Sequence, residues 1–535
     1  MYIFFKYFFL IVSKIFGFVV FTFTFSLIYI QIESLNLKLF EPIIQQSIFT
    51  NYEKKVDIEF NEFYIKFDKN KYDLIFFLKN TLKNKNDLED WKLDLQSKIK
   101  VTTLINNLNR RIIDFEIVSL KSEEDFSINE FYIVGSYNIF SNKDSIIVEA
   151  TAKNLPLNFV KSLWSNNLGN GAREWTLNSL FNGSISELTF DSRLILEKDG
   201  TFLDKPKINL YFTFNDIDTY YLRDMPPITN TIGKGYLNFD TFKISLDDGL
   251  INLNEDTKVF INAGEFNAFD IRKRHGPGRV FINASSNVGN FFSLLSEHDY
   301  VSKLVNLDRN NLSGESKLLL KFDFPLKNSL RFIETKINID LDVEELTIFN
   351  KNKSPSIISS TSILELKYNH NVSKFFKGSI LTENIKILEL PIFAQILDVS
   401  IPGLSNISDG GRDITFSSSS FSIELSNKLI MISDGILKPD SNLPVVGNSL
   451  GLSIAGDYLF NKKEIDFTGT IVPISWLNNL PSNVPLLGGL FSGSKEGEGL
   501  IGIKFRVYNQ NDDEIKIETN PLSVLTPGFL QRIFD

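Results

Sequence analysis

The residue types that most often carry catalysis are scarce in this chain. It contains no cysteine and three histidines, His275, His298 and His370, which are far apart in the sequence. The absence of cysteine excludes disulfides, thiolate metal sites and cysteine nucleophiles. No set of histidines and carboxylates in the sequence has the spacing of a metal site. We therefore predict a protein that is not an enzyme and that has no metal or cofactor.

A few short patterns nevertheless resemble catalytic motifs. Residues 447–451 (GNSLG) fit the G-x-S-x-G nucleophile elbow, which requires a helix after the serine and a histidine further along the chain. Residues 452–456 are typical of a strand instead, and no histidine follows them. Paired carboxylates occur at 247–248 and 512–513, but adjacent strand residues face opposite ways, and both pairs stand in turn-like sequences. We interpret all of these segments as turns.

Composition excludes further classes of protein. The chain has 535 residues, a hydrophobic fraction of 43% and 49 Phe, so extensive disorder is excluded. Its net charge of -9 argues against nucleic-acid binding, which requires a basic surface. One basic segment, 272–279 (RKRHGPGR), could contact anionic lipid headgroups, although a solvated loop is the simpler interpretation.

Long stretches of the chain alternate apolar and polar residues. Residues 336–344 (KINIDLDVE) do so without interruption, which places the four aliphatic side chains on one face of a strand. Turn signals such as 182–183 (NG), 247–249 (DDG), 433–435 (SDG) and 511–513 (NDD) separate such stretches. The sequence therefore predicts a mostly β protein, built as a long and largely antiparallel sheet with one apolar face.

Four short segments have the apolar spacing of helices. They are too short to be stable alone, so we expect each to pack against the sheet. These segments are 157–164 after Pro156, 172–181, 291–295, and 392–397 after Pro391.

The N-terminus has the properties of a membrane anchor. Residues 15–32 are uncharged, largely apolar and long enough to span a bilayer. Lys6 and Lys14 precede this stretch, which places the N-terminus in the cytoplasm and the remaining chain across the membrane. A cleaved signal peptide is the alternative, but no small-residue cleavage site follows the apolar stretch. We predict an uncleaved transmembrane helix within residues 1–32.

Several ordered segments resemble a known family. Together they are similar to the AsmA-like C-terminal region, in the form found in YhdP-type proteins of Gram-negative bacteria. The segments are 390–394 (LPIFA), 469–473 (GTIVP), 483–488 (NVPLLG), 497–500 (GEGL) and 520–530 (NPLSVLTPGFL), with 171–175 (GAREW) and 225–229 (MPPIT) upstream. The resemblance implies an anchor at 1–32, an N-terminal β-groove segment at 33–155, a central β region at 156–330 and the AsmA-like C-terminal region at 331–535.

The resemblance also implies a function. YhdP-type proteins are similar to bridge-like lipid-transfer proteins, which are anchored in the inner membrane and carry phospholipids across the periplasm to the outer membrane. Their curled sheet forms an elongated apolar groove for the acyl chains and supports outer-membrane biogenesis. In this chain the groove would be lined by the alternating apolar positions Ile208, Leu210, Phe212, Phe214, Leu318, Leu320, Phe322, Ile337, Ile339, Leu341, Val343, Ile501, Ile503 and Phe505.

Alternatives stay open from the residues themselves. Alternation does not distinguish a groove from the core of a β-sandwich. An anchored periplasmic scaffold for outer-membrane assembly, which carries no lipid, would share the same anchor and sheet. The apolar C-terminal tip, with Leu525, Phe529, Leu530 and Phe534, either caps the last sheet edge or docks on the outer membrane or a protein there.

Overall fold

The computed structural model describes residues 35–43, 56–68, 73–84, 92–103, 111–119, 130–164, 170–221, 225–296, 311–327, 330–350, 355–388, 414–426, 428–439, 450–473, 501–509 and 514–524. The chain divides into two compact units. Unit 1 comprises residues 1–250 and 264–276, and unit 2 comprises residues 251–263 and 277–535.

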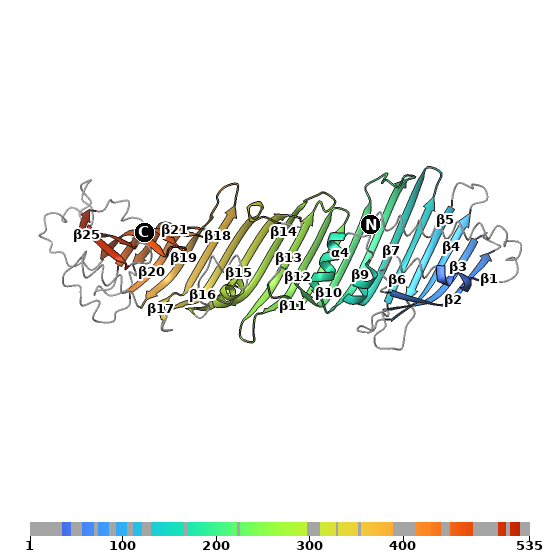
Figure 1. Ribbon diagram of the computed structural model, residues 1–535, viewed down its shortest axis with the longest axis horizontal. Coiled ribbons are helices and arrows are strands. Elements are labelled where there is room, and N and C mark those ends of the chain that lie inside the picture. Colours follow the sequence, from blue (N-terminus) through green and yellow to red (C-terminus); the bar gives the residue numbers. More distant parts are fainter. Residues whose placement is uncertain are drawn as a thin grey trace. The chain divides into compact units, whose positions relative to one another are not determined.

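Unit 1 consists mainly of long antiparallel strands (Figure 1). Strands β2 to β7 pair each with the next, β7 pairs with β9, and β9, β10 and β11 continue the ladder. The strands are β1 (Leu35–Asn36), β2 (Val56–Asp68), β3 (Asp73–Asn84), β4 (Lys92–Thr103), β5 (Arg111–Ser119), β6 (Glu130–Ile139), β7 (Lys143–Pro156), β8 (Leu180–Phe181), β9 (Ser184–Glu197), β10 (Lys207–Thr219), β11 (Ile228–Asn238), most of β12 (Thr241–Asn252) and the end of β13 (Lys258–Phe269).

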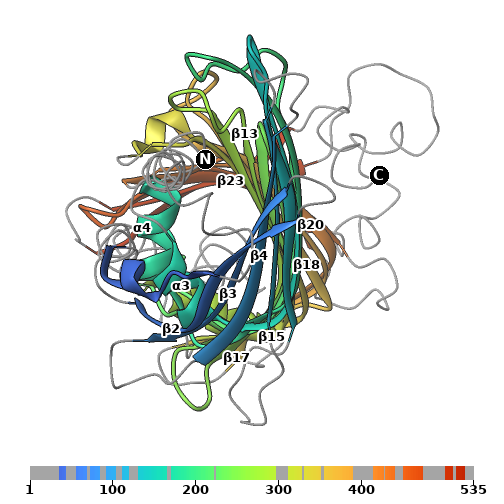
Figure 2. The same cartoon turned by 90° about the vertical axis from the view of Figure 1, so that its right-hand side faces the viewer.

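Two short helices interrupt unit 1 between β7 and β9. Helix α3 (Leu157–Leu163) follows Pro156, which is the N-cap residue rather than the first helical residue, and α4 (Asn170–Ser179) follows α3. Both lie on the inner side of the curved strands of this unit (Figure 2). Helix α3 buries Leu157 and Phe159 against apolar residues of β4, β7 and β10. This packing explains how so short a helix is stable.

A lysine joins the two helices of unit 1. The Lys161 ammonium group donates hydrogen bonds to the carbonyl oxygens of Leu177, at 3.3 Å, and Leu180, and it lies 4.8 Å from the centroid of the Phe181 ring. These carbonyls belong to the last turn of α4 and the residue after it, where the helix leaves acceptors unsatisfied. The C-terminal end of α4 is thereby held against α3.

Unit 2 has the same construction. Its strands pair antiparallel with their sequence neighbours, and the short β17 joins β16 and β19 alongside β18. The strands are β14 (Pro277–Asn287), β15 (Leu312–Pro325), β16 (Lys336–Phe349), β17 (Pro355–Ile358), β18 (Thr361–Asn369), β19 (Phe376–Ile387), β20 (Ile414–Leu425), β21 (Leu429–Pro439), β22 (Leu450–Leu459), β23 (Glu464–Pro473), β24 (Ile501–Tyr508) and β25 (Lys516–Val524). Helix α5 (Val288–Ser296) packs against β14 and β15.

The predicted mostly β, antiparallel class with a few short helices is confirmed. The helices predicted at 157–164, 172–181 and 291–295 correspond to α3, α4 and α5, but Leu180 and Phe181 belong to β8 and not to α4. The fourth predicted helix, at 392–397, lies outside the described residues. So does the predicted anchor at 15–32. Within the described ranges, no helix is long and apolar enough to cross a membrane.

Two turn predictions are wrong. Residues 247–249 lie inside β12, and residues 433–435 lie inside β21. The register of β21 shifts between Ile432 and Gly435, so the acid-glycine segment there forms a bulge in a continuous strand. In β12 both Asp247 and Asp248 are exposed, and the strand continues to Asn252. The turn predicted at 182–183 is confirmed, with both residues at positive φ.

One glycine tests the tightness of the strand packing in unit 2. A Cβ atom at Gly378 would lie 1.7 Å from the carbonyl oxygen of Glu365, which is backbone and cannot rotate away. Gly378→Ala should therefore lower the free energy of unfolding by about 1–3 kcal/mol, the typical range for overpacking. Urea denaturation followed by circular dichroism measures the change. Gly264→Ala is the control, because its new Cβ would meet only the Leu246 side chain, at 3.2 Å. An equal loss of unfolding free energy in both variants would contradict the explanation by backbone overlap.

Candidate functional site

The apolar face of unit 1 is continuous from strand to strand. Because the strands pair in register, apolar residues of neighbouring strands stand directly opposite one another. One row of partners crosses β4, β5, β6, β7, β9, β10 and β11. Its members are Ser97, Ile117, Ile133, Ala150, Phe190, Leu210 and Leu237.

Unit 2 has an equivalent row that crosses most of its strands. The row passes from β14 through β15, β16 and β18 to β25, without a charged residue. Its members are Ile282, Leu320, Ile339, Leu366, Gly378, Ile423, Ile432, Gly456, Phe467, Val507 and Ile517. The unit 2 row contains only apolar residues and glycines, and Ser97 is the one polar member of the unit 1 row, so a largely apolar row extends across these strands of each unit.

The predicted lining residues lie on strands β10, β15, β16 and β24, on the same face as these rows. In unit 1, Leu210 pairs with Phe190 and Leu237, and Phe212 pairs with Leu188. In unit 2, Leu318, Leu320 and Phe322 pair with Leu341, Ile339 and Ile337 respectively. The side chain of Ile501 lies outside the description, whereas Ile503 of the same strand pairs with Ile471.

Burial separates the predicted residues into two groups. A first group is only half-buried, although its members are large and apolar: Leu210, Phe212, Leu318, Leu320, Phe322, Ile337 and Ile339. A second group is core-like, with exposed fractions of 0% for Ile503, 4% for Val343, 5% for Ile208 and Phe214, 6% for Phe505 and 8% for Leu341. The prediction that all of these residues line an open groove is therefore corrected: the second group lies in the core. Phe214 belongs to the cluster that α3 covers, and Ile503 and Phe505 belong to a cluster of β19 to β24.

The opposite face of the sheet carries cross-strand ion pairs. Lys79 pairs with Glu62 at 2.8 Å, Lys153 with Glu130 at 2.6 Å and Lys377 with Glu424 at 2.7 Å, each pair directly opposite in register. Such exposed pairs are screened by water and contribute little to stability, but they mark this face as water-facing.

Near the C-terminal end of unit 2, the same face carries a stronger pair. The Arg506 guanidinium donates two hydrogen bonds, of 2.9 and 2.7 Å, to the Asp466 carboxylate, and these bonds lower the pKa of Asp466. The folded state therefore binds this proton less readily than the unfolded chain. The small stabilisation is present above the unfolded pKa and is lost as the pH falls through the lowered value.

The residues that could carry other chemistry are dispersed. His275 stands in an exposed turn of unit 1, where Lys273 pairs with Asp270 at 2.9 Å and Arg272 lies 3.8 Å from the centroid of the Phe239 ring. Within the described ranges, no three histidines or carboxylates are placed to hold a metal ion. Residues 447–449 and 512–513 lie outside those ranges.

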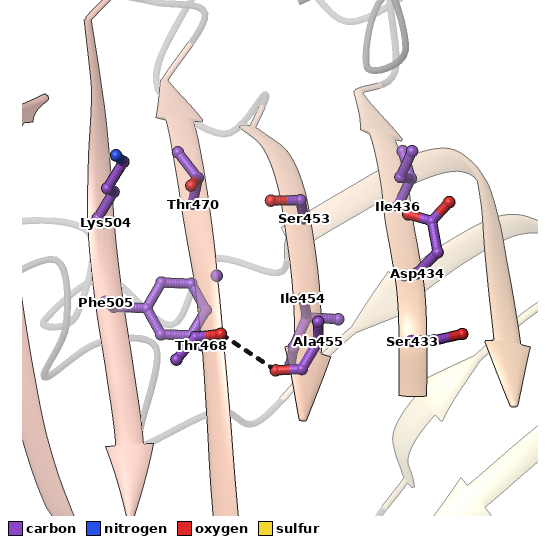
Figure 3. Close-up of a pocket in the computed structure, with 12 residues that line it drawn as sticks. Ser433, Asp434, Ile436, Ser453, Ile454, Ala455, Thr468, Thr470, Lys504 and Phe505 are labelled. Carbon is purple, nitrogen blue, oxygen red and sulfur yellow. Dashed lines mark hydrogen bonds between the residues drawn. The ribbon is translucent and has the colours of Figure 1, made fainter. Parts of the chain in front are cut away.

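A shallow pocket of about 430 Å³ lies on β21 to β24 of unit 2 (Figure 3). Its polar lining residues include Asp434, Ser453, Thr468, Thr470 and Lys504, without a histidine. Thr468 donates a hydrogen bond to the carbonyl oxygen of Ala455 at 3.4 Å. The pocket extends over neighbouring strands and includes Phe505 of the apolar face, so it belongs to the surface of the sheet.

Sequence reasoning missed part of the apolar face. The alternation in β9, β18 and β19 is shorter or interrupted, yet Phe190, Leu364, Leu366 and Ile380 take the same positions as the predicted residues. Pairing in register identifies them, since each is opposite a predicted residue or its partner. The tip residues Leu525, Phe529, Leu530 and Phe534 lie outside the described residues.

Comparison of the sequence with models of known protein families gives no match, and comparison with curated protein sequences gives none. The resemblance to the AsmA-like C-terminal region stays a prediction, and so does the division of the chain into 1–32, 33–155, 156–330 and 331–535.

The difference in burial predicts different responses to a charge on the apolar face. Ile503→Asp places a carboxylate at a fully buried position and should lower the free energy of unfolding by about 3–5 kcal/mol. Ile339→Asp introduces the same group where water reaches it, and should cost only about 1–2 kcal/mol. Urea titrations of both variants measure the difference. Equal losses would place Ile339 in a closed core.

Proposed function

We propose that this protein is a non-catalytic lipid carrier, in which the apolar face of the sheet holds the acyl chains of phospholipids. The observation that carries the proposal is the set of half-buried, large apolar residues on β10 of unit 1 and on β15 and β16 of unit 2. Leaving such a face in contact with water costs about 25 cal/mol for each Å² of apolar surface. Contiguous apolar surface of this kind marks an interaction site for an apolar ligand or partner.

The two faces of the sheet fit this ligand. In strands β15 and β16 of unit 2, Leu320 and Ile339 lie on the apolar face, while Lys321 and Asn338 of the same strands are exposed on the other face. Acyl chains need only apolar contact and no directed hydrogen bonds. Polar headgroups can stay in water at the edge of the sheet, so the carrier requires no headgroup site and no catalytic residue.

The setting that we propose follows the predicted anchor and the family resemblance. A single-pass helix within residues 1–32 would hold the protein in the inner membrane, with the sheet in the periplasm. The sheet would form an elongated groove that moves phospholipids between the inner and outer membranes and so supports outer-membrane biogenesis. The C-terminal tip would meet the outer membrane or a protein there.

Lipid extraction tests the proposal. The full chain is purified in a mild detergent, and phospholipids in solvent extracts are quantified by mass spectrometry per mole of protein. We expect stoichiometric phospholipid with the natural sequence and a several-fold smaller amount with Ile339→Asp, because a charge on the apolar face opposes acyl chains.

Asp340→Asn is the matched control, because it changes the neighbouring residue of β16 on the opposite face. Lipids that surround an N-terminal anchor are the same in all three proteins and cancel in the comparison. Equal lipid content in all three would contradict the carrier. A folded protein without lipid would favour a periplasmic scaffold.

A further inference from the structure

Phenylalanine rings on the apolar face repeatedly lie over a glycine of the neighbouring strand. Each pair stands directly opposite in the strand register, and both units contain such pairs. Within the described residues they are Phe115–Gly135, Phe212–Gly235 and Phe214–Gly233 in unit 1, and Phe324–Gly278, Phe421–Gly435, Phe467–Gly456 and Phe505–Gly469 in unit 2. We call them the ring–glycine pairs.

The geometry shows where the rings lie. A Cβ atom added at Gly235 would be 2.0 Å from Cζ of Phe212 and 2.4 and 2.6 Å from its two Cε atoms. At Gly135 and Gly469 the opposite ring comes within 2.4 Å of the added Cβ. At these three glycines the opposite ring therefore occupies space that a side chain would fill, close against the backbone. At Gly469 the backbone carbonyl oxygen of Ser453 lies nearer still, at 2.2 Å, and at Gly278 the ring is 3.1 Å from the added Cβ. In Figure 3 the Phe505 ring extends from β24 across β23.

The glycine of each pair lowers the stability of its strand. Glycine in a strand interior destabilises the strand by roughly 0.5–1 kcal/mol relative to alanine, because the unfolded chain loses more freedom. An aromatic ring laid over glycine recovers part of that loss by covering the backbone. A closed core could fill the same space with alanine or valine and an upright ring. With glycine at this position, the ring lies against the backbone of the neighbouring strand instead of standing upright.

We propose that the ring–glycine pairs whose rings are half-buried, which excludes those of Phe214 and Phe505, keep the apolar side chains close to the sheet, so that acyl chains have room above them; this inference rests on the proposed function. A ring that lies against the backbone presents apolar surface without projecting from the sheet. Where the pair is disturbed, the ring must rise into the space that the acyl chain uses. The pairs would then determine how much lipid the face accepts.

Gly235 offers the clearest test, because the nearest neighbours of its added Cβ are all atoms of the Phe212 ring. A ring can rotate away, so Gly235→Ala should keep the fold and displace the ring. The natural chain and Gly235→Ala are made in cells with a photo-crosslinking residue at position 210, next to Phe212 on the same face. Crosslinked phospholipid per mole of protein is then measured. We expect a roughly tenfold loss, equivalent to about 1.4 kcal/mol of binding.

Two further variants make the test specific. Lys234→Ala changes the exposed neighbour of Gly235 on the opposite face and should label as the natural chain does. Phe212→Leu combined with Gly235→Ala removes the displaced ring and should restore most of the labelling. Equal labelling of Gly235→Ala and the natural chain, or no recovery in the double variant, would overturn the inference. Absence of labelling in the natural chain would instead contradict the proposed function as a lipid carrier.

Discussion

Antiparallel pairing in register is the constraint on which the other features of both units depend. Strand side chains alternate between two faces, so a slip of one residue would move every apolar side chain to the water-facing side. In unit 2 the partners of Ile339 are Leu320 on one side and Leu366 on the other, and the row continues to Ile517. The ion pairs of the opposite face keep the same register, as Lys377 and Glu424 show. Both faces therefore favour one alignment.

That constraint creates an apolar face but does not determine how it is covered. In unit 1, helix α3 buries Phe214 and its neighbours, whereas Leu210 on the same strand is left half-buried. In unit 2, Ile503 is fully buried while Ile339 is not. The face thus contains segments that stabilise the fold and segments that leave apolar surface for a ligand. The carrier that we propose uses the second kind and relies on the first for stability.

The sequence predicts the faces better than it predicts their interruptions. Alternation in β10, β15, β16 and β24 identifies the apolar side chains because the two-residue period is a local property. It does not reveal that 247–249 and 433–435 stay inside strands, since acidic and glycine residues are typical of turns and yet also occur within strands, at 433–435 in a bulge. Alternation also does not predict which apolar residues are buried, because the elements that cover them are distant in the chain. The ring–glycine pairs carry a weak signal, as Phe212-x-Phe214 and Gly233-x-Gly235 share a spacing that only the register makes meaningful.

Photo-crosslinking along one row of partners tests the central claim most directly. A photo-reactive residue is placed in turn at the half-buried positions 282, 320 and 339 of the apolar face, and at positions 283, 321 and 340, which follow them on the opposite face. The account predicts that phospholipid is crosslinked at the first three positions and not at the second three. Absence of lipid at 282, 320 and 339, or equal labelling at all six positions, would contradict an acyl-chain-binding face.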